Sequence, residues 1–192
     1  MLARIVEALA RFMAILGGLV LTGLILMTCL SIAGRWLNGV LNADAFEGVA
    51  LAEWLLARGV GPITGDFELV EAGMAFVIFA FLPITQLHGA HASVDIFTRA
   101  LGEKSNRALA AAWAVLFAAV LILIARQLWL GTQDKARYGE TTFLIQFPIW
   151  WAYAASLVGA VIAAATACYV ATVRVVEAFT GQPILPDEGT EH

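Results

Sequence analysis

The sequence has few charged residues, and its long apolar runs carry no acidic residue near their centres. Asp, Glu, Lys and Arg make up 14% of the 192 residues, whereas soluble domains average about 25%. Hydrophobic residues make up 61%, and the mean hydropathy is +0.84. Lys and Arg form no cluster that would indicate a nucleic-acid partner. The composition excludes an ordinary soluble domain and favours an integral membrane protein.

Cysteine and histidine are also scarce, which restricts redox and metal chemistry. Cys29 and Cys168 fall inside apolar runs, so we interpret them as packing residues and not as a disulfide or metal pair. His88, His91 and Asp95 have a spacing that can place metal ligands on one helix face. The sequence has no second cluster of His or Cys that could complete a metal coordination shell or supply a second haem ligand. We therefore expect no metal, no cofactor and no catalytic residue.

Four apolar runs are long enough to cross a hydrocarbon layer of about 30 Å at about 1.5 Å per residue. We predict an all-α integral membrane protein with four transmembrane helices and short interfacial helices. The membrane domain is expected over residues 12–176, with spans at about 12–34, 69–87, 108–130 and 148–173. Outside the spans we expect an interfacial amphipathic helix at 1–11, a connection at 35–66 with a second interfacial helix at 45–58, and a disordered tail at 177–192.

The first apolar run allows a second interpretation, because Ser31-Ile-Ala33 resembles the cleavage site of a signal peptide. The run is longer than the roughly 7–15 residues of a signal-peptide core, so we favour a span. N-terminal sequencing of the purified protein distinguishes the two, since a start at Gly34 would exclude the four-span interpretation.

The second predicted span is bordered by polar residues at both ends. Asp66 stands where an N-cap is expected, and Glu68 and Glu71 follow in the first turns, where acids interact favourably with the helix dipole. Pro83 lies inside the span and is expected to kink it. The acids before the span and the histidines after it lie about 28 Å apart at about 1.5 Å per residue, so they cannot form one site.

The last predicted span has small residues at every fourth position, a pattern that lets helices approach closely. Ser156 and Ala160 belong to one such row, and Gly159 belongs to the adjacent row. Two neighbouring rows predict helix partners on more than one side. Trp150 and Trp151 open the span, as is typical of residues at the lipid–water boundary.

Transport by this chain alone is not expected. Coupled transport uses an ionisable group within the membrane, and no predicted span has an Asp or Glu near its centre. Paired helices broken by Gly or Pro, which are typical of a transporter core, are also missing. Six Lys or Arg on the side of the termini against five on the other side favour cytoplasmic termini by the positive-inside rule.

Two stretches resemble a known family. The first is Gly-Asp-Phe-Glu-Leu-Val-Glu at 65–71, leading into a span that ends Pro-Ile-Thr-Gln-Leu-His-Gly-Ala-His-Ala-Ser-Val-Asp at 83–95. The second is Tyr-Gly-Glu-Thr-Thr at 138–142 followed by Ile-Gln-Phe-Pro-Ile-Trp-Trp-Ala-Tyr at 145–153. In order and spacing they resemble the small membrane subunit, of the DctQ type, of tripartite ATP-independent periplasmic (TRAP) transporters. The resemblance covers roughly residues 12–176.

The resemblance implies a non-enzymatic subunit of a sodium-coupled importer in the bacterial inner membrane, with both termini cytoplasmic. A large membrane subunit would carry the elevator pathway, and a periplasmic binding protein would deliver an organic acid such as a carboxylate. The small subunit would brace the scaffold of the large one and help to dock the binding protein. Roles in partner contact or helix-end positioning are expected for Glu68, Glu71, Pro83, His91, Asp95, Trp150, Trp151, Ser156, Gly159 and Ala160.

Two other classes stay open. The chain could be a membrane anchor or redox subunit that binds quinone or haem, and a Soret band from the purified protein would favour this class. It could also be a small transporter that acts as an oligomer of itself, which uptake by the lone chain would favour.

Overall fold

The computed structural model describes residues 2–43, 49–89 and 102–181. These residues form α-helices and contain no strand, apart from one isolated bridge between Thr141 and Pro148. The predicted all-α class is confirmed. The helices are α1 (Leu2–Leu41), α2 (Ala50–Ala57), α3 (Asp66–Leu87), α4 (Glu103–Tyr138) and α5 (Ile149–Thr180).

Within the described residues, α1, α3, α4 and α5 are long and apolar enough to cross a membrane. The 22 residues of α3 reach about 33 Å at about 1.5 Å per residue, close to the thickness of a hydrocarbon layer of about 30 Å. The other three helices have 40, 36 and 32 residues, so they must project beyond that layer. The four predicted spans thus correspond to four helices of a membrane protein.

The three longest helices run beyond the spans expected from apolar composition. Helix α1 is continuous from Leu2, so residues 2–11 are its first turns and not a separate helix. Helix α4 continues to Tyr138, through residues expected to form a loop. Helix α5 continues to Thr180, into the predicted tail, whose residues 182–192 lie outside the described part of the chain. Hydropathy marks only the part of a helix that lipid covers, whereas backbone hydrogen bonding continues into water.

Glycine sets the true ends of α4 and α5. Gly139 and Gly181 adopt left-handed conformations, with φ of 63° and 73°. Each N–H donates to a carbonyl of the preceding turn, Gly139 to Lys135 and Gly181 to Glu177. This is the usual way in which a glycine after a helix satisfies the last carbonyl groups. The two helices therefore stop where the chain reaches glycine and not where hydropathy falls.

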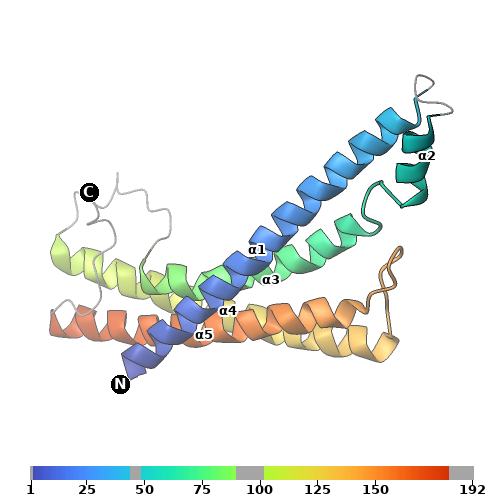
Figure 1. Cartoon of the computed structure of the whole chain (residues 1–192). Helices are drawn as coiled ribbons and strands as arrows, with labels where there is room; N and C mark the ends of the chain where they lie inside the picture. The colour runs from blue at the N-terminus through green and yellow to red at the C-terminus, as the bar shows by residue number, and fades with distance from the viewer. Residues whose placement is uncertain (1, 44–48, 90–101, 182–192) are drawn as a thin grey trace.

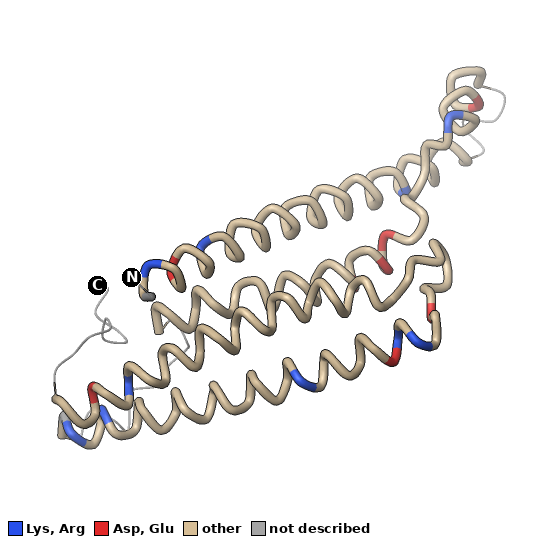
Figure 2. The backbone as a smooth tube through the Cα atoms, turned by 90° about the horizontal axis from the view of Figure 1, so that it is seen from below, with Lys and Arg blue, Asp and Glu red and all other residues tan. Residues whose placement is uncertain are grey.

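The four long helices pack as a row in which α5 lies between α3 and α4, and α3 lies between α5 and α1 (Figures 1 and 2). Helix α1 crosses α3 obliquely and diverges from α5 toward its own C-terminal end (Figure 1). The buried core between α4 and α5 consists mostly of alanine, which lets the helices approach closely. Its members are Ala118, Leu121, Ala163, Ala164, Ala167 and Ala171.

Charged residues gather toward the two ends of the row (Figure 2). One end carries the start of α1, the end of α3, the start of α4 and the end of α5. The other end carries α2, the start of α3 and the turn between α4 and α5 (Figure 1). The polar contacts between helices lie mainly at these ends.

Candidate partner site at the hairpin end of the bundle

The turn between α4 and α5, residues 139–148, is a short hairpin, and we refer to it below as the hairpin. The N–H of Thr142 donates to the carbonyl of Phe147 at 2.9 Å, and the N–H of Phe147 donates to Thr142 Oγ1 at 3.0 Å. The N–H of Ile149 donates to the carbonyl of Glu140 at 3.1 Å. These bonds give the turn a defined shape although only one bridge pair lies in it.

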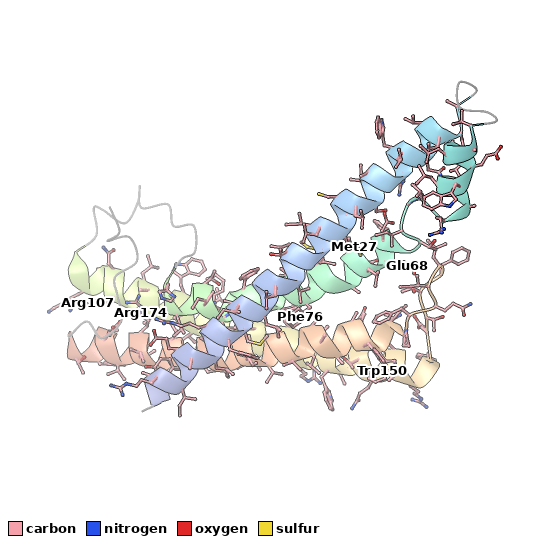
Figure 3. The ribbon with its side chains drawn as sticks, viewed as in Figure 1. Met27, Glu68, Phe76, Arg107, Trp150 and Arg174 are labelled. Carbon is pink, nitrogen blue, oxygen red and sulfur yellow. The ribbon has the colours of Figure 1, made fainter. Side chains whose placement is uncertain are left out.

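Glu68 ties the hairpin to the start of α3. Its carboxylate accepts the backbone N–H of Leu144 at 2.6 Å and that of Ile145 at 3.1 Å. Figure 3 shows Glu68 at the end of α3 that faces the hairpin. A carboxylate that accepts two backbone N–H groups forms charge-assisted bonds, which are stronger than neutral ones. Glu68, for which a positioning role was expected, therefore connects two segments that lie far apart in the sequence.

Gly65 lets the hairpin lie directly on the start of α3. It has a φ of 76°, and a Cβ built on it would lie 2.3 Å from Ile145 Cγ2. Any other residue would both strain the backbone and collide with the hairpin. Gly65 is also the residue that precedes the first turn of α3, so the N-cap predicted at Asp66 is wrong.

Asp66 instead joins α3 to α1. The buried hydroxyl of Ser31 donates to Asp66 Oδ2 at 2.5 Å and accepts the N–H of Ile63 at 3.2 Å. Arg35 lies 3.5 Å from the same carboxylate oxygen. The other oxygen, Asp66 Oδ1, accepts the N–H of Phe67 at 2.7 Å, so one carboxylate joins the first turn of α3 to α1. One feature of the sequence indicates this contact, namely a serine near the end of an apolar span.

A pocket of about 360 Å³ lies below the hairpin, between α3 and α5, with one contribution from α4. Below it, Gly159 brings α5 against α3, since a Cβ on Gly159 would lie 2.9 Å from Phe79 Cβ. The pocket is lined by Glu68, Glu71, Ala72, Ala75, Phe79, Leu128, Thr142, Phe147, Ile149, Ala152, Tyr153 and Ser156. Two of the predicted site residues besides Glu68, namely Glu71 and Ser156, therefore border the same space.

Other residues expected at a partner interface are buried within this chain. Ala160 has no exposed surface, and Gly159 is also buried. In the chain by itself, the small residues of α5 pack against α3 and α4, so the helix neighbours expected on two sides are helices of the same chain. This outcome follows from the row arrangement, in which α5 has a helix on each side.

Trp150 and Trp151 lie at the first turn of α5, on the outside of the bundle. Their side chains are 38% and 54% exposed. Trp151 makes edge-to-face contacts with Trp150 and Phe147, with ring centroids 5.9 Å and 5.8 Å apart. The cluster places aromatic rings at the helix end beside the hairpin, as expected for a lipid–water boundary.

The far end of α3 is only partly described. Pro83 is fully buried, and α3 continues through it to Leu87. His88 Nδ1 lies 3.0 Å from the carbonyl of Ile84, a contact within its own helix end. His91 and Asp95 lie outside the described residues, so their expected roles stay predictions.

At this end of the row lie two polar contacts that the sequence did not reveal, one within α5 and one from α4 to the residue that ends α5 (Figure 3). Arg174 Nη1 donates to Glu177 Oε2 at 3.1 Å, and their side chains are only 11% and 5% exposed. Arg107 donates to the carbonyl of Gly181 at 2.7 Å. Glu177 was expected in a disordered tail, and only the extension of α5 places it in a buried ion pair.

The fold and these sites define a multi-pass helical membrane protein whose polar side chains mainly hold helix ends and connecting turns together. Residues 48–181 match the family model for the DctQ component of tripartite ATP-independent periplasmic transporters, and the chain belongs to this family. The match leaves out α1, although the resemblance was expected from residue 12. Neither a curated protein nor a solved structure matches the chain. Membership makes the chain a component of a transporter that also has a large membrane subunit and a binding protein.

Proposed function

We propose that this chain is the non-catalytic small subunit of a sodium-coupled importer, and that it braces the scaffold of the large membrane subunit. The observation that carries this proposal is the family match over residues 48–181. The fold is consistent with it, because the described helices have no acidic residue near the middle of a span. Such a chain has the packing surfaces of a brace and lacks the intramembrane carboxylate that many coupled transporters use.

The shape of the molecule also suits a brace. A row of helices has two broad faces and two outer helices, here α1 and α4, that can pack along a larger neighbour. The outer helices expose many large apolar side chains. Examples are Leu19, Leu26 and Ile32 of α1 and Val120, Ile122 and Leu123 of α4. These outer faces are apolar, so a large membrane protein or lipid can cover them without breaking any hydrogen bond of this chain.

We further propose that the hairpin end faces the periplasm and takes part in docking the binding protein. Phe143 and Leu144 at the hairpin are 92% and 57% exposed, although the turn around them is polar. Glu68 fixes the backbone at this point, so the two side chains are presented on a defined support. The opposite end, which carries the start of α1 and the end of α5, would then be cytoplasmic, as would both termini, and the membrane would be the bacterial inner membrane. We take the cargo to be an organic acid such as a carboxylate.

Reconstitution with each component omitted in turn tests the proposal. We expect sodium-dependent uptake of a carboxylate by vesicles that hold this chain, the large subunit and the binding protein. Vesicles that hold this chain alone should show none, because no pathway group lies within its spans. Uptake by the lone chain would contradict the proposal, and so would full uptake by the other two components without it.

A further inference from the structure

The pocket between α3 and α5 contains polar groups that the chain leaves unpaired. Ser156 is 2% exposed, and its Oγ has no hydrogen-bond partner among the described residues. Glu71 lines the same pocket, and no described side chain or backbone group pairs with its carboxylate. A buried hydroxyl without a hydrogen-bond partner costs free energy, so such groups usually have a partner in the assembled protein. The pocket is therefore incomplete in the isolated chain.

We propose that this pocket receives the side chain of a Lys or Arg from a membrane helix of the large subunit. The cationic head would pair with Glu71 and donate a hydrogen bond to Ser156 Oγ. This inference rests on the proposed function, since it takes the large subunit as the partner, and it identifies where and through which chemistry the two chains join.

Charge complementarity favours a cation as the occupant. The other acids at the start of α3 are already engaged, Glu68 with two backbone N–H groups and Asp66 with Ser31. Lys135, which interacts electrostatically with Tyr153 of the pocket wall, bonds Glu140 at 2.5 Å. Arg126 is exposed and stands two residues from Leu128, the α4 residue that lines the pocket, so it points to another face of α4. Glu71 is thus available to a charge from outside the chain.

The walls of the pocket favour a long side chain with an apolar stem. Ala72, Ala75 and Ala152 line it with short side chains, and the Gly159 contact with Phe79 brings α3 and α5 together below it. Lys and Arg pass an apolar stem along such walls while the charged head reaches a polar group near the membrane boundary. The volume of about 360 Å³ is at the lower end of ligand pockets, roughly 300–1,000 Å³, and admits one such side chain.

A phospholipid fits the pocket less well. Its phosphate would have to approach within the same small space as the carboxylates of Glu68 and Glu71, and like charges at short distance repel. A protein side chain brings the positive charge without the phosphate. We therefore commit to a basic side chain of the partner and treat a bound lipid as an outcome that would overturn the proposal.

Co-purification of the two membrane subunits in mild detergent tests the proposal. We expect Glu71→Gln to lower the retained large subunit at least about tenfold, a factor that corresponds to about 1.4 kcal/mol. Ser156→Ala should also lower retention, while the thermal stability of the lone chain stays unchanged or rises because an unpaired hydroxyl is removed. Glu53→Gln, at an exposed acid of α2 away from the pocket, is the matched control and should retain the partner fully.

A charge exchange identifies the partner residue. Glu71→Lys should abolish retention, and one Lys→Glu or Arg→Glu change in a membrane helix of the large subunit should restore it. Restoration by none of them would overturn the proposal. A phospholipid retained by the lone wild-type chain in native mass spectrometry, and lost from the Glu71→Gln variant, would overturn it in favour of a lipid. Melting curves of the lone variants show whether any loss of retention comes from unfolding.

The two proposals fail in different ways. If the wild-type chain does not retain the large subunit, the bracing role is wrong. If the wild-type chain retains it and Glu71→Gln and Ser156→Ala retain it equally, the bracing role stands and the pocket contact is wrong.

Discussion

Glu68 and Asp66, two residues apart at the start of α3, hold different parts of the chain. Glu68 accepts N–H groups from the hairpin, and Asp66 accepts the hydroxyl of Ser31 in α1. The bonds point to opposite neighbours because α3 lies between α1 and α5 in the row. Two carboxylates thus attach α3, the shortest of the four long helices, to both of its neighbours at the end of the row that carries the hairpin.

Removal of the Glu68 carboxylate should loosen the hairpin without unfolding the chain. In Glu68→Ala the N–H groups of Leu144 and Ile145 lose their acceptor, so we expect their hydrogen exchange to accelerate roughly tenfold or more, as local opening becomes easier. Hydrogen–deuterium exchange with mass spectrometry of the hairpin peptides measures this. Glu53→Ala, which removes an acid of α2 that accepts no such bond, is the control. Equal exchange in both variants would show that Glu68 does not hold the hairpin.

At the scale of elements, close approach in this protein depends on residues that lack bulk at the points where helices touch. Gly159 brings α5 against Phe79 of α3, and Ala160 and Ala163 beside it have no exposed surface. Large residues at these positions would push the helices apart, and the pocket between Gly159 and the hairpin would change shape. The small residues of α5 therefore set both the packing and the width of the candidate site.

Adding a methyl group at Gly159 should destabilise the chain. In Gly159→Ala the new Cβ would lie 2.9 Å from Phe79 Cβ and 3.1 Å from its backbone carbon, so the helices must separate. We expect a loss of about 1–3 kcal/mol, the usual cost of overpacking, seen as a lower midpoint in thermal unfolding in detergent. Gly23→Ala in α1 is the matched control, because no atom lies within 4 Å of its added Cβ. A midpoint for Gly159→Ala as high as that of Gly23→Ala would exclude a tight contact.

At the scale of the whole molecule, the row divides the polar groups between two ends with different structures. One end carries the hairpin, α2 and the pocket, and the other carries the buried pair of Arg174 with Glu177, the start of α1 and the end of α5 (Figures 1 and 3). The positive-inside count differs by only one residue, so it distinguishes the two sides weakly, and the family resemblance implies the same orientation. The orientation can be measured directly.

We expect a reporter fused after Glu188 to be on the cytoplasmic side and one inserted in the hairpin after Phe143 to be on the periplasmic side. Alkaline phosphatase, which is active only outside the cytoplasm, should be inactive at the first position and active at the second. The reverse pattern would place the candidate docking surface on the wrong face of the membrane. Activity at both positions would show that α5, the only helix that the structure describes between them, does not cross the membrane.

The sequence by itself determined the class of protein, the approximate positions of the four spans and the family. Hydropathy suffices for this because lipid requires about twenty apolar residues for each crossing, and every backbone group must be satisfied within the helix. It also marked Glu68, Glu71 and Ser156 as notable, since acids at a helix start and small residues at every fourth position are local patterns. Helix ends were less predictable, because α4 and α5 stop at glycines and not where hydropathy falls.

Only the tertiary structure decided what these residues contact. Glu68 accepts N–H groups from residues 144 and 145, and Asp66 accepts the hydroxyl of Ser31, because of the order of the helices in the row. The same order turns the small residues of α5 inward and brings Glu71 and Ser156, which lie on different helices, to one pocket. Which helix faces which is set by packing between segments far apart in the chain, and no local pattern encodes that choice.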